Sequence, residues 1–195
     1  MTSSRASLGQ RSPSPPVVVP AVGAPVLLFV YGVLRWVDGL DGGHGPGPAW
    51  YAGHAAFLLA FVLLGVLVVG LRRLVPARSA RQRVLADAAV VAGLAGVLGF
   101  LWVILGDLFR WLHDNAPLPG PLYAVAPPLF QLGLMTLLVR AVVVRPRLLP
   151  ARGPVLVFLG LVAIAADLDL LPVGAVLVLC GLSPLGRSTA GTVPR

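Results

Sequence analysis

Two of the four charged residue types that are always ionised at neutral pH are missing, because the 195-residue sequence contains no lysine and no glutamate. Only 11% of the residues are charged, against about 25% in a typical soluble domain, and 57% are hydrophobic. A water-soluble protein of this size could not bury so much apolar surface. The composition therefore predicts a chain whose solvent is the hydrocarbon of a lipid bilayer.

Cysteine is almost absent as well, since Cys180 is the only one. A single cysteine excludes an intramolecular disulfide, a CxxC redox motif and a cysteine-rich metal site. Its neighbours in VLVLCGL are apolar, so we expect it to pack inside a membrane span. The sequence also lacks a GxxxxGK[ST] phosphate loop, a GxSxG elbow and the HxxxH and HExxH metal pairs. These absences favour a non-enzymatic protein with no cofactor and no metal site.

Long apolar stretches make up most of the chain. Each of the first four has about the 20 residues that cross roughly 30 Å of hydrocarbon, and the last is too long for one straight crossing. All must be helical, because lipid offers no hydrogen-bond partner to a bare peptide group. The stretches cover residues 17–37, 51–71, 85–106, 122–144 and 154–185. We therefore predict an all-α fold, a polytopic transmembrane helical bundle of about five spans, with five or six helices according to whether the last segment is broken.

The two ends of the chain have a different composition from the bundle, residues 17–186. Residues 1–16 are rich in Ser, Arg and Pro, which predicts a disordered cytoplasmic tail. A signal peptide is the rival interpretation, but the apolar stretch runs on to Val37 without a small-residue cleavage site. Residues 187–195 are predicted to form a short polar tail. The richness in Ala, Gly, Pro and Arg is typical of a GC-rich bacterial genome.

Arginines supply all the positive charge, and the net charge is +8. A basic chain can bind nucleic acid, but these arginines stand beside apolar stretches and no nucleic-acid motif is present. We therefore expect no nucleic acid and instead expect the lipid bilayer, with its anionic head groups, as the partner. The predicted head-group contacts are Arg72, Arg73, Arg78, Arg81 and Arg83.

The orientation follows from the distribution of arginine over the loops. With the N-terminus in the cytoplasm, only Arg35 and Arg110 lie outside, apart from the C-terminal segment, whose side depends on whether the last stretch is broken. Such asymmetry is the positive-inside pattern, and it predicts a multi-pass protein of the cell membrane with a cytoplasmic N-terminus. The arginines placed inside are Arg5, Arg11, Arg72, Arg73, Arg78, Arg81, Arg83, Arg140, Arg145, Arg147 and Arg152.

Two acids, Asp167 and Asp169, fall inside the last apolar stretch. An aspartate at the centre of a span costs about 2.5–3.5 kcal/mol on the insertion scale. A helix break relieves the cost, with one helix ending near Asp169 and the next beginning at Pro172. The second half then either returns partway as a re-entrant segment or crosses in a thinned region of the membrane. The alternative is one long tilted helix that carries both acids to the outer interface. Gln131, a polar residue within the fourth span, could extend this candidate intramembrane site inward.

The two acids are open to two interpretations. An intramembrane acid often marks an ion, proton or substrate site. A structural role is the other interpretation, in which the carboxylates cap a broken helix or pair with Arg35 or Arg110.

A second candidate cluster lies at the outer ends of three spans. Asp38, His54 and Asp107 could face Asp167 in the folded bundle, as a His–carboxylate cluster that binds a divalent metal or relays protons. Their spacing matches no metal motif, so ordinary interface residues that prefer the wet head-group region are the alternative.

Small residues recur every four positions in two spans. The ladders are Ala52, Ala56 and Ala60, and Ala88, Ala92 and Gly96. Such ladders let helices approach closely in lipid, so we expect them to face neighbouring helices.

Three functions remain open from the sequence. The first is a non-enzymatic scaffold or partner subunit, which would have a membrane-protein partner or form a homo-oligomer. The second is a small proton- or ion-coupled transporter that uses Asp167 and Asp169 at a broken helix. The third is an outer-face, metal-dependent membrane enzyme that uses His54 with neighbouring acids.

Overall fold

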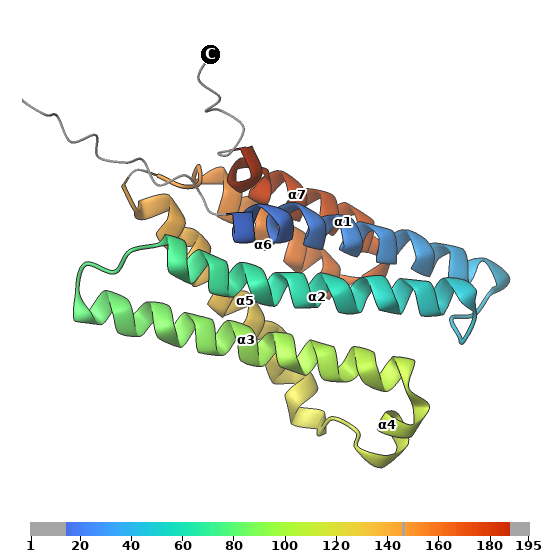
Figure 1. The fold of residues 1–195 in the computed structure, drawn as a ribbon. Helices are drawn as coiled ribbons and strands as arrows, with labels where there is room; N and C mark the ends of the chain where they lie inside the picture. Colours follow the sequence, from blue (N-terminus) through green and yellow to red (C-terminus); the bar gives the residue numbers. More distant parts are fainter. Residues whose placement is uncertain (1–14, 146, 188–195) are drawn as a thin grey trace, which may run out of the picture.

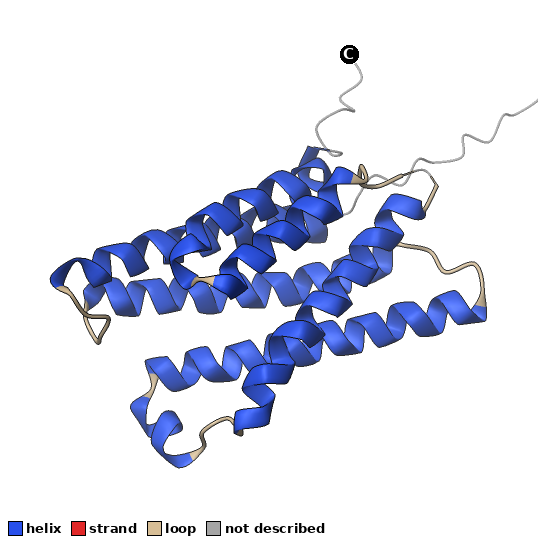
Figure 2. Ribbon diagram, turned by 180° about the vertical axis from the view of Figure 1, so that it is seen from behind, coloured by secondary structure: helices blue, strands red, loops and turns tan. Residues whose placement is uncertain are grey.

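The computed structural model describes residues 15–145 and 147–187, and these residues form helices and no strand (Figures 1 and 2). The prediction of an all-α helical bundle is confirmed. The predicted tails, residues 1–16 and 187–195, lie almost entirely outside the described residues. The helices are α1 (Pro15–Asp38), α2 (Pro48–Leu74), α3 (Ala80–Leu108), α4 (Arg110–Asn115), α5 (Gly120–Val143), α6 (Arg152–Ala166) and α7 (Leu171–Arg187), with single 3-10 turns η1 (Gly39–Asp41) and η2 (Leu168–Leu170).

Five helical segments of the described chain are long and apolar enough to cross a membrane. They are Val17–Asp38, Pro48–Leu74, Ala80–Leu108, Gly120–Val143 and Leu168–Gly186. The remaining apolar helix, α6, has 15 residues. By length and composition, the chain is an integral membrane protein.

The long helices form two groups that meet between α2 and α3. In the first group, α1 packs along α2 and α7, and α7 packs along α6. In the second group, α5 crosses α3 obliquely and packs against it (Figures 1 and 2). Although α5 and α6 follow one another in the sequence, they touch only over a short length. A cavity described below lies beside this loose seam.

The last apolar segment is broken, as the first of the two predicted arrangements requires. α6 ends at Ala166, the chain turns through η2, and α7 runs back alongside α6 as an antiparallel hairpin. Glycines bring the two backbones together, because a Cβ on Gly160 would lie 2.5 Å from the carbonyl oxygen of Gly174. Gly153 and Gly181 face each other in the same way nearer the open end.

The hairpin is short and ends before α1 does. At 1.5 Å per residue α6 extends roughly 22 Å, less than the roughly 30 Å of a bilayer's hydrocarbon. Pro172, at the start of α7, packs against Gly32 of α1, where a Cβ would lie 2.7 Å from the proline ring. The tip of the hairpin therefore lies near Arg35, about a turn before the end of α1 (Figure 1).

Backbone contact also fastens α3 to α5. A Cβ on Gly133 of α5 would collide with the backbone of Ala89 and Gly93 on α3, and one on Gly96 would collide with Phe130. The ladder of small residues predicted for α3 is therefore only partly correct, because Gly96 is buried against α5 but Ala88 is exposed.

The ladder predicted for the second span is also partly wrong, because Ala60 is buried and Ala52 is exposed. The prediction for Cys180 is wrong as well, since its side chain is exposed on the outside of α7. In each case the residue lies in a helix, as expected, but on a different face of it.

Candidate functional site

Charge is segregated to the two ends of the bundle. One end, called the basic end here, holds every described arginine except Arg35 and Arg110. The opposite end, called the acidic end, holds every described aspartate except Asp87. The basic end lies on the left of Figure 1 and the acidic end on the right. Both predicted acid clusters belong to the acidic end.

Asp167 is the residue at which α6 stops. Its backbone is extended, with φ −155° and ψ 127°, and its carboxylate oxygen Oδ1 accepts a hydrogen bond of 2.9 Å from the Asp169 backbone N–H. Aspartate is one of the preferred caps of a helix start, because its side chain satisfies a free N–H. The Asp167 carboxylate therefore shapes the turn of the hairpin.

Asp169 fastens the hairpin tip to α1 through two contacts. Its carboxylate oxygen Oδ1 lies 3.5 Å from Nε of Arg35, and its backbone carbonyl accepts a 3.0 Å hydrogen bond from the Trp36 indole N–H. The Asp169 side chain is 62% exposed and that of Arg35 is 25% exposed, so solvent weakens the ion pair. Both structural alternatives for the acids, a cap and a pair with Arg35, are present.

This geometry predicts a modest, coupled effect of removing the pair. Asp169→Asn keeps the size of the side chain but removes its charge, so we expect a loss of at most about 1 kcal/mol in the free energy of unfolding. In the double variant Arg35→Gln/Asp169→Asn, the loss should be smaller than the sum of the two single losses. Thermal unfolding in detergent gives the stability of the wild type, the two single variants and the double variant. Asp114→Asn, which removes an exposed pair with Arg110, is the control and should change nothing measurable.

His54 is the buried polar residue of the acidic end, with 8% of its surface exposed. Its Nδ1 donates to the carbonyl oxygen of Trp50 at 2.9 Å, because a carbonyl can only accept. Its Nε2 lies 3.6 Å from Oδ2 of Asp107 on α3. The Trp50 ring lies 4.0 Å from the imidazole and the Tyr31 ring meets it edge-on at 5.4 Å. His54 thus links α2 to α3 and to α1.

Asp38 makes a separate contact. Its Oδ2 accepts a 3.3 Å hydrogen bond from the Gly45 backbone N–H, which closes the loop between α1 and α2. Asp38 and His54 also line a hollow of about 10 Å³, roughly the space one water molecule needs. The predicted outer cluster is therefore only partly assembled: His54 meets Asp107, whereas the Asp167 carboxylate bonds to the Asp169 backbone in the hairpin turn. No group of three or more His, Cys, Asp or Glu within the described residues could hold a metal ion.

Gln131 lies apart from the two acids, although the sequence placed it with them. It lines a cavity of about 250 Å³ beside the seam between α5 and α6. Leu168, at the hairpin tip, lines the same cavity, but Asp167 and Asp169 do not.

Aromatic rings form much of the cavity wall, with Phe61 and Phe100 stacked at 4.2 Å. These phenylalanines were not predicted as part of a site from the sequence. The four-residue spacing of Phe57 and Phe61 was the available signal, because it places both on one face of α2.

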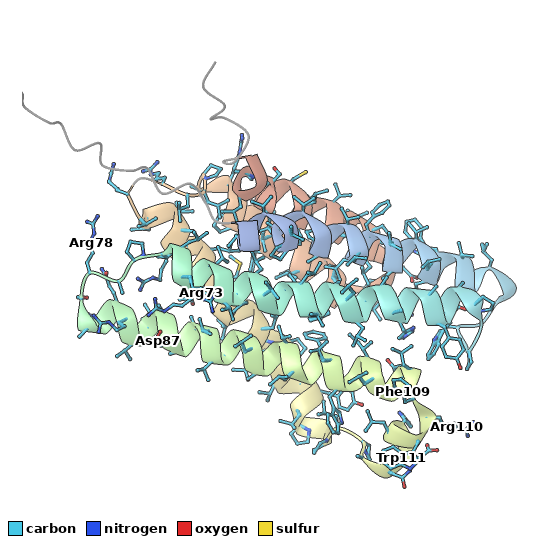
Figure 3. The ribbon with its side chains drawn as sticks, in the orientation of Figure 1. Arg73, Arg78, Asp87, Phe109, Arg110 and Trp111 are labelled. Carbon is cyan, nitrogen blue, oxygen red and sulfur yellow. The ribbon has the colours of Figure 1, made fainter. Side chains whose placement is uncertain are left out.

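The basic end contains the arginines that were expected to touch lipid head groups. Arg73, Arg78, Arg81 and Arg83 are exposed there, whereas Arg72 is bound to Asp87 at 2.7 Å. Figure 3 shows Arg73 on α2, Asp87 on α3 and Arg78 on the loop between these helices.

The acidic end carries a short helix that the sequence did not predict. α4 follows directly after α3 and presents two exposed aromatic side chains, Phe109 and Trp111, on either side of Arg110 (Figure 3). An exposed tryptophan with a neighbouring cation is typical of the membrane–water interface. The end of α3 and α4 therefore have the chemistry of an interfacial anchor.

Comparison of the chain with protein-family models, with curated proteins and with solved structures finds no significant match.

Proposed function

We propose that the chain is a non-enzymatic multi-pass protein of the cell membrane that serves as a scaffold or partner subunit. The supporting observation is that the polar groups at the acidic end contact other parts of the protein. Asp169 pairs with Arg35, His54 pairs with Asp107, and Asp167 caps the turn of the hairpin. The first two contacts join separate segments of the bundle and the third orders the turn between α6 and α7, so these groups serve the structure of the bundle.

The proposed orientation puts the basic end in the cytoplasm, with the N-terminus. The segregation of arginine and aspartate to opposite ends supports this placement through the positive-inside rule. Because α7 runs antiparallel to α6, Arg187 then lies on the same side as Arg152. The hairpin tip faces the outside.

A partner helix would find the widest free surface on α3. Of the five candidate spans α3 is the least buried, because only 28% of its most apolar 18-residue stretch is buried against the rest of the protein. Its outward residues Val91, Leu98 and Trp102 are large, apolar and exposed. Either lipid or a partner helix, including one from a second copy of the chain, can cover such a face.

The test of the scaffold proposal is ion movement. Purified protein in sealed vesicles with a trapped pH dye should give no proton flux above that of empty vesicles when a pH gradient is applied. A flux that Asp167→Asn abolishes, and that Asp114→Asn leaves intact, would overturn the proposal. The result would then favour the carrier.

The carrier remains the second candidate because of two observations. The helix is broken at a pair of acids, and a cavity of about 250 Å³ lies beside the break. Discontinuous helices beside a cavity are typical of carriers.

The metal-dependent enzyme has the contact of His54 with Asp107 in its favour. Stoichiometric metal in the purified protein, lost in His54→Ala, is the observation that would support it.

A further inference from the structure

A groove of about 420 Å³ opens at the basic end, between the α2–α3 loop and the last turn of α5. Three arginines line it: Arg78 from the loop, Arg140 from α5 and Arg145 just beyond α5. No acidic residue is among the lining residues. Asp87, the described acid at this end, is engaged with Arg72. The groove therefore carries a concentrated positive charge with no internal counter-charge.

Arg140 is held in place but not fully satisfied. Its Nη1 donates a 2.6 Å hydrogen bond to the backbone carbonyl of Gln82, which fixes the guanidinium between α5 and α3. Its Nε is buried and has no hydrogen-bond partner among the described residues. A buried donor without an acceptor costs free energy, more so on a charged group. The hydrogen bond to Gln82 therefore holds the charge of Arg140 fixed in the wall of the groove.

Apolar side chains form the other wall of the groove. Leu85 of α3 and Val139 and Val143 of α5 all line it, and they are 52%, 49% and 73% exposed. Leu85 and Val139 lie further into the bundle than Arg78 and Arg145, whereas Val143 is the last residue of α5 and lies beside them. A ligand that fills the groove must therefore have an anionic group joined to an apolar chain.

We propose that this groove binds an anionic phospholipid, with its phosphate against Arg78, Arg140 and Arg145 and an acyl chain along Leu85, Val139 and Val143. Guanidinium groups bind phosphate oxygens through short, charge-assisted hydrogen bonds, and three of them line this groove. Basic pockets between helices on the positive side of membrane proteins hold such head groups. The site is distinct from the diffuse attraction of the loop arginines, because arginines from the α2–α3 loop and from the end of α5 line one groove together with apolar side chains.

The test compares two double variants that remove equal charge from the basic end. Arg78→Gln/Arg145→Gln empties the groove of its exposed arginines, and Arg81→Gln/Arg147→Gln removes two exposed arginines that do not line it. Neither pair should disturb folding, because the four side chains are exposed and the hydrogen bond of Arg78 to Gln82 uses the backbone N–H.

Each protein is loaded with an equal mixture of phosphatidylglycerol and phosphatidylcholine of the same chain length, and retained lipid is counted by native mass spectrometry. We expect wild type to retain phosphatidylglycerol selectively. The groove variant should retain at least about tenfold less, because one hydrogen bond to a charged group is worth a factor of that order. The matched variant should stay within about threefold of wild type, because salt screens exposed charges.

Two outcomes would overturn the assignment. Equal losses in both double variants would show that only the overall charge of this end attracts lipid. Displacement of the bound lipid from wild type by inorganic phosphate or by a dihexanoyl analogue, as effectively as by the long-chain lipid, would show that the apolar wall plays no part. The displacement measurement uses only the wild-type protein. It therefore tests the assignment even if the double variants fail to fold.

Discussion

A cysteine placed at position 168 should be labelled by a membrane-impermeant thiol reagent on intact cells, in a chain whose native cysteine is removed by Cys180→Ser. Leu168 is 44% exposed at the tip of the α6–α7 hairpin, which the proposed orientation turns outward. Arg187→Cys, at the end of α7, should be labelled only after the membrane is opened. Labelled protein is distinguished from unlabelled protein by the mass that the reagent adds.

The matched control for this experiment is Leu171→Cys. Leu171 lies a single turn from Leu168 but is fully buried, so its replacement should react only after denaturation. Labelling of position 187 from the outside would mean that the last segment crosses the membrane once and that the hairpin does not form there. Labelling of position 168 only after lysis would reverse the proposed orientation.

Adding one methyl group at Gly133 should be among the most damaging small substitutions in the bundle. A Cβ there meets backbone atoms of Ala89 and Gly93, which cannot rotate away as a side chain can. Overpacking typically costs about 1–3 kcal/mol, and we expect Gly133→Ala to reach the upper end of that range. The midpoint of thermal unfolding should fall by roughly 5–10 °C for a chain of this size.

Gly106→Ala provides the comparison for this result. Gly106 belongs to α3, but a Cβ there has nothing within 4 Å. Replacing a helical glycine with alanine in open space stabilises a helix by about 0.5–1 kcal/mol. The two variants should therefore shift the unfolding midpoint in opposite directions. Equal shifts would show that α3 and α5 do not touch through their backbones.

The architecture could be predicted from the sequence because lipid imposes severe constraints. An apolar stretch of about 20 residues has few alternatives to a helix, and the length of the last stretch pointed to a break. Asp167 and Pro172 marked its place, since one favours the cap of a helix and the other its first turn. The two short segments α4 and η2 could not be foreseen, because neither carries a periodic pattern.

Helix faces were harder to predict than helices. In a soluble protein the polar side of a helix faces water, but in a membrane both the lipid-facing side and the packed side are apolar. Ala88, the first residue of the predicted ladder in α3, was therefore assigned to the wrong face, and Cys180 was assigned to the interior. Backbone contacts such as that of Gly133 with Gly93 depend on how the helices cross, which one sequence does not specify.

The candidate site was predicted as a set of residues but not as a set of contacts. His54 and Asp107 do meet, and Asp169 does reach Arg35, since all four lie at matching depths in their helices. Gln131 has a different surrounding from the two acids, because the rotation of α5 turns it toward the cavity. The three-arginine groove at the basic end was missed, because Arg78 is far in the sequence from Arg140 and Arg145.

The short hairpin also gives the protein an uneven hydrophobic thickness. α6 spans roughly 22 Å, whereas α2, with 27 residues, spans roughly 40 Å. Lipids beside the hairpin meet the polar tip several ångströms sooner than lipids beside α2, so the leaflet at the acidic end should thin locally. Each ångström of mismatch costs a fraction of a kcal/mol. The protein should therefore concentrate in thin or strongly curved regions of its membrane, with the hairpin on the thinner side.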